Sequence, residues 1–150
     1  MAKVLIVYHS LSGNTKAAAA AVAEGVRAAG GTALVKEGLK AGPDDLLGCD
    51  AVALGSPDYF SYIAGGLKDF FDRTYYPTQG KVTGKPYAAF GSAGGPAATV
   101  IGCIERMAQA FKLTQAAEPV GAAGKPSAEI LEQCRRQGAA LARAAAKGTA

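Results

Sequence analysis

Residues 4–16 read Val4-Leu5-Ile6-Val7-Tyr8-His9-Ser10-Leu11-Ser12-Gly13-Asn14-Thr15-Lys16, an apolar run followed at once by a loop of hydroxyl-bearing residues and glycine. The apolar run does not alternate with polar residues, so it predicts a strand that is buried on both faces. After the loop, an alanine-rich stretch from about residue 15 to 29 favours a helix, because alanine has the highest helix propensity. This order of elements is typical of an α/β fold.

Four further apolar runs follow the first and alternate with longer stretches of helical period. They lie at residues 32–35, 51–54, 87–90 and, with a weaker pattern, 113–120. This alternation predicts a doubly wound parallel sheet of five strands, with helices on both faces. The chain has no linker, internal repeat or block of charge, so we expect one domain over residues 1–150, with residues 144–150 as a frayed tail.

Three stretches place apolar side chains on one face at helical spacing, and each can cover the sheet. The first face carries Leu67, Phe70, Phe71 and Thr74, and the second carries Val100, Ile104, Met107, Ala108 and Phe111. In the third stretch, Ser127 is the expected N-cap, because its hydroxyl can accept a hydrogen bond from the first helical turn. The apolar stripe of this last helix is Ile130, Leu131, Cys134, Gly138, Leu141 and Ala145.

Composition and charge exclude several classes of function. The chain has 150 residues, of which 49% are hydrophobic, enough for one sizeable core. The net charge is +4, but the 16 basic residues are spread thinly from Lys3 to Lys147, which favours a solvated surface over nucleic-acid binding. The apolar run at residues 4–8 is too short for a membrane span or a signal-peptide core, so we expect a cytoplasmic protein with no membrane partner.

The cysteines indicate neither a disulfide framework nor a zinc site. Cys49, Cys103 and Cys134 are odd in number and widely spaced, and they form no Cys-x-x-Cys pair. We therefore expect reduced thiols in the core and no metal site.

The loop after the first strand has the chemistry of a phosphate site. In a doubly wound sheet, ligands bind outside the carboxyl ends of the strands, where this loop lies. Ser10, Ser12 and Thr15 supply hydroxyl groups, Gly13 permits a tight turn, and the next helix directs free N–H groups into the loop. An ordinary turn has similar residues, so this loop alone leaves both interpretations open. The glycine patterns of nucleoside triphosphatases and of dinucleotide-binding folds do not follow this strand.

Two more loops have residues suited to a flat aromatic ring. After the third strand, Pro57-Asp58-Tyr59-Phe60-Ser61 and then Tyr62 place three aromatic side chains outside the strand pattern, where an uncovered apolar patch is unfavourable. After the fourth strand, Ser92-Ala93-Gly94-Gly95 would let backbone N–H groups approach the edge of a ring. The alternatives are aromatic side chains that belong to the core and a flexible glycine turn.

The three loops together resemble those of the flavodoxin family. The family's phosphate loop follows its first strand and has the pattern Ser/Thr-x-Ser/Thr-Gly-x-Thr, which residues 10–15 match at every specified position. Residues 50–57 and 66–73 are similar to the third strand and following helix of flavodoxin-like proteins, and residues 124–127 with 131–134 are similar to their last helix. The resemblance implies the strand order 2-1-3-4-5 and FMN bound without a covalent bond.

The resemblance also implies which residues contact FMN. Backbone amides and hydroxyls of the first loop would hold the phosphate, and the other two loops would hold the ring. The implied cofactor-binding residues are Ser10, Leu11, Ser12, Gly13, Asn14, Thr15, Pro57, Asp58, Tyr59, Phe60, Ser61, Ser92, Ala93, Gly94 and Gly95. Because FMN performs the redox chemistry, we expect no catalytic side chain. For His9, the only histidine, we expect packing at the strand end rather than titration beside the phosphate.

The second and third loops resemble the flavin quinone-reductase and NADPH-dependent FMN-reductase branches more than the carrier flavodoxins. The implied function is an FMN oxidoreductase that takes electrons from NAD(P)H to a quinone or a similar small acceptor. The alternative is a non-enzymatic electron carrier that docks onto redox partner proteins. A flavin-free interaction module on the same scaffold is a third possibility. The sequence leaves the oligomeric state open.

Overall fold

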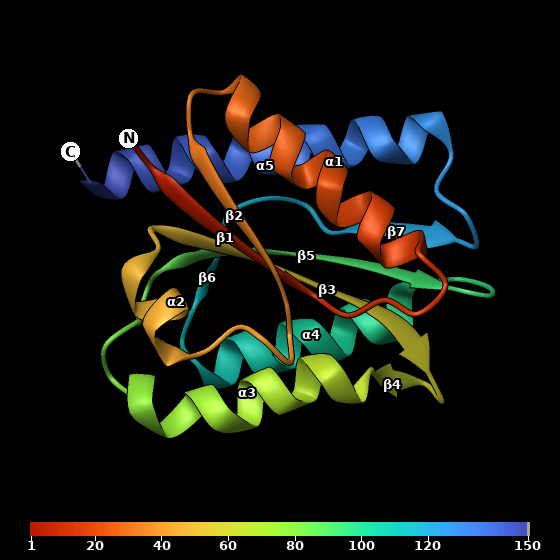
Figure 1. Ribbon diagram of the computed structural model, residues 1–150, viewed down its shortest axis with the longest axis horizontal. Coiled ribbons are helices and arrows are strands. Elements are labelled where there is room, and N and C mark those ends of the chain that lie inside the picture. Colours follow the sequence, from red (N-terminus) through yellow and green to blue (C-terminus); the bar gives the residue numbers. More distant parts are fainter. Residues whose placement is uncertain (150) are drawn as a thin grey trace.

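Strands and helices alternate along the chain in the computed structural model, which describes residues 1–149. The elements are β1 (Lys3–Tyr8), α1 (Asn14–Ala28), β2 (Thr32–Glu37), α2 (Pro43–Gly48), β3 (Ala51–Tyr59), β4 (Tyr62–Ile63), α3 (Gly65–Thr78), β5 (Pro86–Ala93), α4 (Ala98–Ala110), β6 (Thr114–Gln115), β7 (Val120–Ala123) and α5 (Ala128–Thr149). Figure 1 shows α1 and α5 on one side of the sheet and α3 and α4 on the other. The predicted α/β fold is confirmed.

The strands lie in the order β2-β1-β3-β5-β6, and β7 also pairs with β5. All of these pairs are parallel. With β6 and β7 counted as one fifth strand, this is the predicted order 2-1-3-4-5. The described part of the sheet nevertheless has seven strands, because β4 adds to β3 as an antiparallel partner and the fifth strand is broken between residues 115 and 120.

A side chain of α5 compensates for the break in the fifth strand. β6 pairs with the beginning of β5 and β7 pairs with its end, so the middle of β5 lacks part of its ladder. Buried Gln137 donates through Nε2 to the backbone oxygens of Ala89 (2.8 Å) and Glu118 (3.0 Å). The amide thus takes the place of the missing strand partner, since a buried carbonyl needs a donor.

The two faces of the sheet carry different cores. Towards α1 and α5, the central strands and α1 contribute mostly small side chains, among them Val4, Ala51, Ala53, Ala19 and Val22. Towards α3 and α4, the core contains larger side chains, among them Leu5, Leu54, Leu67, Phe70, Phe71 and Ile104. The predicted faces of both helices are confirmed, with Met107 partly buried against this core.

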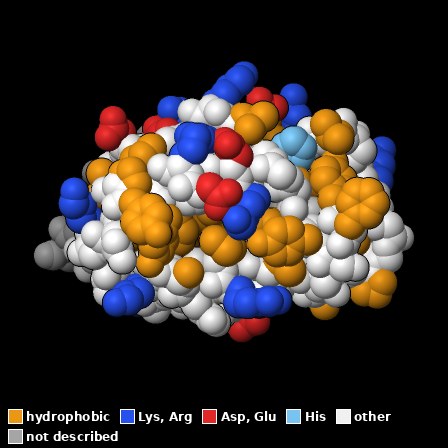
Figure 2. Space-filling view, turned by 90° about the horizontal axis from the view of Figure 1, so that it is seen from below, with side chains coloured by type: hydrophobic (Ala, Val, Ile, Leu, Met, Phe, Trp, Pro, Cys, Tyr) orange, Lys and Arg blue, Asp and Glu red, His pale blue; other side chains and the backbone are white. Residues whose placement is uncertain are grey.

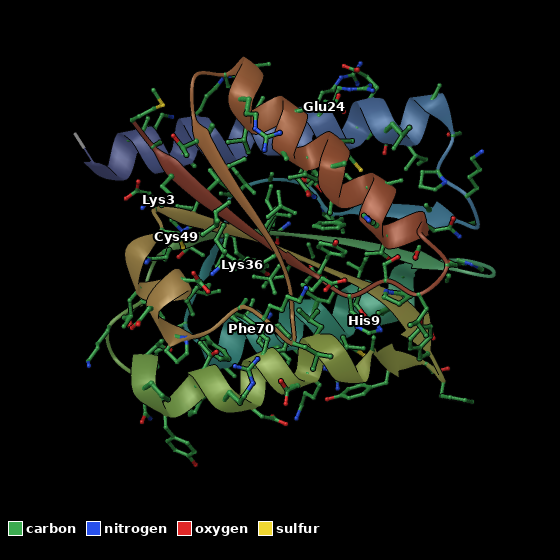
Figure 3. All side chains as sticks on the ribbon, viewed as in Figure 1. Lys3, His9, Glu24, Lys36, Cys49 and Phe70 are labelled. Atoms are coloured by element: carbon green, nitrogen blue, oxygen red, sulfur yellow. The ribbon has the colours of Figure 1, made fainter. Side chains whose placement is uncertain are left out.

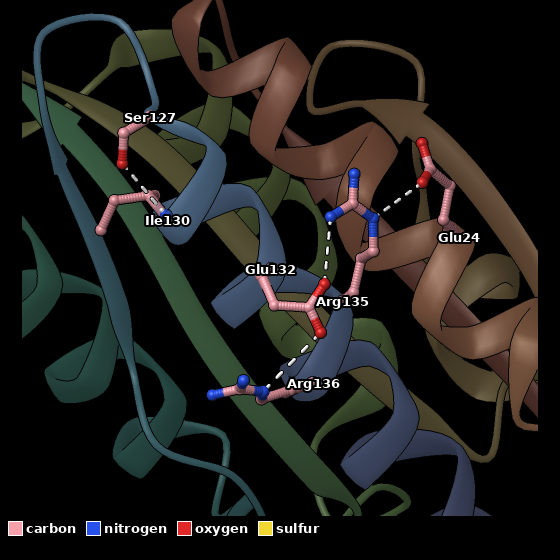
Figure 4. A network of polar contacts seen from close by, with 6 residues as sticks. All are labelled: Glu24, Ser127, Ile130, Glu132, Arg135 and Arg136. Atoms are coloured by element: carbon pink, nitrogen blue, oxygen red, sulfur yellow. Dashed lines mark hydrogen bonds and ion pairs between the residues drawn. The ribbon is translucent and has the colours of Figure 1, made fainter.

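Helix α5 begins as predicted, because the Ile130 N–H donates to the Ser127 hydroxyl at 3.2 Å (Figure 4). The helix packs tightly on α1, where Gly25 lies against the Arg135 backbone and leaves no room for a Cβ atom. Arg135 also donates from Nε to Glu24 at 3.0 Å across this contact. Helix α5 continues through residues 144–149 of the expected frayed tail, and residue 150 lies outside the described residues. No helix within residues 1–149 is both long enough and apolar enough to cross a membrane.

Candidate functional site

The three predicted loops meet at the carboxyl ends of β1, β3 and β5. Gly55 of β3 pairs with Tyr8 of β1, and Pro57 pairs with Ser92 of β5. The Thr15 hydroxyl, in the first turn of α1, lies 2.8 Å from the Ser92 hydroxyl. The structure therefore brings residues from all three loops together at the carboxyl ends of the strands, as their positions in the sequence predict.

The first loop is closed by its own hydroxyl groups. The Gly13 N–H donates to Ser10 Oγ at 3.1 Å, and the Asn14 N–H donates to Ser12 Oγ at 3.4 Å. Both serines accept through oxygen, so their own hydroxyl protons remain able to donate to a ligand. Gly13 has a φ of +97°, a left-handed conformation that glycine adopts without the strain of a side chain.

The beginning of α1 adds backbone donors to this loop. The first helical hydrogen bond runs from the Ala17 N–H to the Gly13 oxygen at 3.0 Å. The N–H groups of Thr15 and Lys16 precede it in the sequence, so they have no carbonyl partner within the helix. Thr15 itself is buried, at 1% exposure, and its side chain is fixed by Ser92. Hydroxyl groups, free amides and the positive end of a helix form a donor set that suits a phosphate group.

The second loop differs from its prediction. The third strand does not end at Leu54 but continues to Tyr59, so Pro57, Asp58 and Tyr59 belong to β3. Phe60 and Ser61 form a turn, and Tyr62 begins β4, which pairs back onto β3. The segment is therefore a β-hairpin rather than an open loop.

The position of Pro57 explains why a strand can run through it. The His9 N–H donates to the Gly55 oxygen at 3.2 Å, so the backbone of Gly55 faces β1. Two residues further, the backbone of Pro57 faces the same side, where β1 has already ended. Proline has no N–H to donate, and beyond the end of a neighbouring strand none is required.

Side chains hold the hairpin at its base and at its tip. The fully buried Ser56 hydroxyl donates to the Pro57 oxygen (2.7 Å) and accepts from the Ala64 N–H (2.8 Å), which joins the two ends of the hairpin. At the tip, the Ser61 N–H donates to Asp58 Oδ1 at 2.8 Å. The Asp58 carboxylate is thus engaged within the hairpin.

His9 lies between the hairpin and α3. Its ring meets the Tyr59 ring edge to face, with 6.1 Å between centroids and an interplanar angle of 82°. Gly66 in the first turn of α3 lies against the imidazole and leaves no room for a Cβ atom. His9 packs at the strand end, as expected, and Figure 3 places it at the end of the sheet opposite Lys3 and Cys49.

The third loop is shorter than predicted, because Ser92 and Ala93 are the last residues of β5. Gly94 and Gly95 are exposed, and a Cβ atom added to either would meet nothing within 4 Å. Their lack of side chains is therefore not required by packing within the chain. The Gly124 N–H donates to the Ala93 oxygen at 2.7 Å and connects this loop to the end of β7.

Burial and hydrogen bonding raise the pKa of several groups near these loops and in the core. Burial, with a contribution from the Glu37 carboxylate, raises the pKa of Tyr8 at the end of β1, so its hydroxyl stays neutral. The hydrogen bond to Asp72 raises the pKa of Lys68 near the beginning of α3. Burial raises the pKa of the Cys49 and Cys134 thiols to about 11, so both stay protonated. These two cysteines are core thiols, as predicted.

Sequence reasoning missed three residues that support the loops. Ser56 lies within Gly55-Ser56-Pro57-Asp58, which has the composition of a turn, so the sequence did not indicate a buried hydroxyl in a strand. Cys103 of α4, whose thiol donates to the Ser61 oxygen at 3.9 Å, and Gly124 gave no local signal. Their contacts join segments that are distant in the sequence.

Comparison with known proteins identified a matching family model, relatives in sequence and solved structures of similar fold. Residues 34–125 match the sequence model of the NADPH-dependent FMN reductase family. This range contains the hairpin and the glycine loop, while the first loop lies outside it. A flavodoxin from Aquifex aeolicus is 34% identical, over 95% of this chain and 86% of its own length.

Other relatives are longer. An NAD(P)H dehydrogenase (quinone) from Rhizobium rhizogenes is 32% identical over 69% of this chain, and the match covers 65% of that protein. A second, from Azorhizobium caulinodans, is 36% identical over 61% of this chain and 57% of its own length. The chain thus spans less than two thirds of the length of these quinone dehydrogenases.

Solved structures have the same fold. An archaeal flavodoxin superposes with a TM-score of 0.86 and 27% identity, over 96% of this chain and 99% of its own. A WrbA-like flavodoxin from Agrobacterium tumefaciens superposes with a TM-score of 0.82 over 98% of this chain and 99% of its own, at 23% identity.

Proposed function

The chain belongs to the flavodoxin-like family of FMN-binding proteins, and from that premise we propose that it is an FMN-dependent oxidoreductase. It would take electrons from NAD(P)H and pass them to a quinone or a similar small acceptor. The balanced reaction is NAD(P)H + H⁺ + quinone → NAD(P)⁺ + hydroquinone. FMN supplies the redox chemistry when bound, and we assign no catalytic side chain and no metal.

One observation carries the proposal: the Thr15–Ser92 contact, which joins the donor-rich first loop to the end of β5. A phosphate at the first loop would place the rest of a flavin towards the neighbouring strand ends, where the hairpin and the open glycine loop lie. This arrangement provides anion donors at one end and the aromatic side chains of Tyr59 and Phe60 at the other.

The proposed FMN site has two parts. The phosphate would be bound by Ser10, Leu11, Ser12, Gly13, Asn14 and Thr15, through amides and hydroxyls. The ring would lie among Pro57, Asp58, Tyr59, Phe60, Ser61, Ser92, Ala93, Gly94 and Gly95. Within the second part, Tyr59 is held by His9, and the exposed glycines leave room for the ring edge.

An electron carrier is the second candidate. The Aquifex aeolicus flavodoxin matches nearly the whole chain, whereas the quinone dehydrogenases extend well beyond it. Such a carrier would exchange electrons with redox partner proteins rather than with NAD(P)H. In either role we propose a cytoplasmic location.

Anaerobic stopped-flow mixing of the FMN-loaded protein with NADH and with NADPH tests the proposal. We expect rapid bleaching of the flavin band by one of the two nucleotides, followed by repeated turnover when a quinone is added. Bleaching by dithionite alone, with no reaction towards either nucleotide, would contradict the enzyme and favour the carrier.

A further inference from the structure

The fifth strand of the sheet contains a bulge at residues 116–119. Tyr87 of β5 pairs with Gln115 of β6, and Phe90 of β5 pairs with Val120 of β7. Two residues of β5 therefore lie opposite four residues of the fifth strand. The two extra residues have no position in the ladder, so regular pairing is interrupted here.

A cleft of about 430 Å³ lies between this bulge and α5. One wall is the bulge, with Glu118 and Pro119, and the other is formed by α5 positions 133, 136, 137 and 140, which share one face of a helix. The volume falls within the range of small-molecule sites. The cleft contains no residue of the proposed FMN site and lies on the α5 side of the sheet. Figure 2 shows the α3–α4 face, where hydrophobic, acidic and basic side chains are interspersed.

Gln137 leaves a buried acceptor without a partner at this cleft. Its side chain lines the cleft and is 3% exposed. Nε2 uses both of its hydrogens on the oxygens of Ala89 and Glu118, which fixes the orientation of the amide. Within residues 1–149, no group donates a hydrogen bond to Oε1. A buried acceptor without a donor is unfavourable, so a ligand that brings an N–H group would stabilise this site.

The two walls of the cleft carry opposite charges. Glu118 is exposed on the bulge, and its carboxylate has no ion-pair partner in the part of the chain that the structure describes. The Arg136 side chain is 75% exposed, and its Nε lies 3.7 Å from Glu132 Oε1 (Figure 4). Such a long, exposed contact is weak, so the terminal N–H groups of the guanidinium remain able to bind an anion. The cleft thus offers acceptors to a cationic group and donors to an anionic one.

We propose that this cleft binds a zwitterionic α-amino acid with an apolar side chain. The ammonium group would donate to Gln137 Oε1 and to the Glu118 carboxylate, and the ligand's carboxylate would accept from Arg136. The apolar side chain would lie against Val120 and Ala140, which also line the cleft. A simple anion would bring no donor for Gln137, and a simple amine would bring no acceptor for Arg136. The inference concerns a second site and does not depend on the proposed function.

Isothermal titration calorimetry of the FMN-loaded protein with leucine tests this inference. Two analogues each lack one charge: 4-methylpentanoate has no ammonium group, and 3-methylbutylamine has no carboxylate. For leucine we expect a Kd of about 0.1–1 mM, as for a ligand with few atoms. Binding of 4-methylpentanoate should be at least about tenfold weaker, because a buried acceptor stays unpartnered. Binding of 3-methylbutylamine should be about two- to fivefold weaker, because only an exposed ion pair is lost.

Substitutions at exposed positions test the two walls separately. Gln137 is kept, because its amide also supports β5. Glu118→Gln and Arg136→Ala should each weaken leucine binding about two- to fivefold. Glu129→Gln and Arg143→Ala are the matched controls, since both residues are exposed on α5 outside the cleft. They should leave the leucine Kd within about 1.5-fold, the size of a weak surface effect.

Three results would overturn the inference. The first is leucine that does not bind at about 10 mM. The second is 4-methylpentanoate that binds as tightly as leucine, because the cleft would then not recognise an ammonium group. The third is an unchanged leucine Kd in both Glu118→Gln and Arg136→Ala, which would place the bound leucine elsewhere.

Discussion

The first loop, residues 10–15, and the hairpin, residues 57–63, lie at the same end of the sheet, at the carboxyl ends of β1 and β3. Different contacts hold each of them in place. The first loop uses its own serines, a glycine in the conformation that glycine favours, and the helix that follows. The hairpin places two non-glycine residues in a left-handed turn and depends on Ser56 and Cys103, which lie outside it. A loop held by local contacts can be recognised from its sequence, whereas one held by distant side chains cannot.

The largest effect should come from the base of the hairpin. Ser56→Ala removes the hydroxyl that serves both the Pro57 oxygen and the Ala64 N–H. We expect a loss of about 3 kcal/mol in the free energy of unfolding, because two buried backbone groups lose their partner. Urea unfolding measures this loss.

Ser61→Ala is the matched control for Ser56→Ala, because it removes an exposed hydroxyl from the same hairpin. It should change the free energy of unfolding by less than about 0.5 kcal/mol. Equal effects of the two substitutions would show that the hairpin does not depend on its buried hydroxyl.

A smaller effect is expected where the first loop meets β5. Thr15→Val keeps the shape of the side chain but removes the hydroxyl that lies 2.8 Å from Ser92. We expect about 2 kcal/mol of lost stability and about tenfold weaker FMN binding, because a buried oxygen loses its partner and a phosphate donor is lost. Thr99→Val, at an exposed position of α4, should change neither quantity appreciably. If FMN binding weakened equally in Thr15→Val and Thr99→Val, the loss of affinity could not be attributed to the Thr15–Ser92 contact.

The smallest effect tests the glycine of the first loop. Gly13→Ala adds a Cβ atom where nothing lies within 4 Å, so only the φ of +97° opposes it. We expect a loss of about 1 kcal/mol from the left-handed strain. Gly102→Ala is the matched control, because Gly102 also has open space but lies within α4. It should stabilise the protein by about 0.5–1 kcal/mol, since alanine favours a helix. If Gly13→Ala and Gly102→Ala changed the free energy of unfolding in the same direction, the left-handed conformation of Gly13 would have no specific role.

Much of the fold follows from local patterns. The unbroken apolar run of β1 predicts a strand covered on both sides, and the spacing of Leu67, Phe70 and Phe71 predicts the buried face of α3; both are confirmed. The N-cap at Ser127 is also confirmed, because one side-chain hydrogen bond within a single turn is a local feature.

The missed features depend on contacts between distant segments. Ser56-Pro57-Asp58 has the composition of a turn, and the structure makes it strand because β1 ends beside it and Ser56 closes the hairpin. The break in the fifth strand depends on Gln137, whose partner oxygen at Ala89 is 48 positions away. Helix α2 has six residues, too few to establish a helical period, and it was not predicted.

The central claim is that the first loop binds the phosphate of FMN, and a comparison of FMN with riboflavin tests it most directly. Riboflavin has the same ring but no phosphate, so equilibrium titration of the apoprotein with each flavin isolates the contribution of the loop. We predict that FMN binds at least about 100-fold more tightly, because several charge-assisted hydrogen bonds are lost with riboflavin. Affinities within about threefold of each other, a difference below 1 kcal/mol, would contradict a phosphate site at residues 10–15.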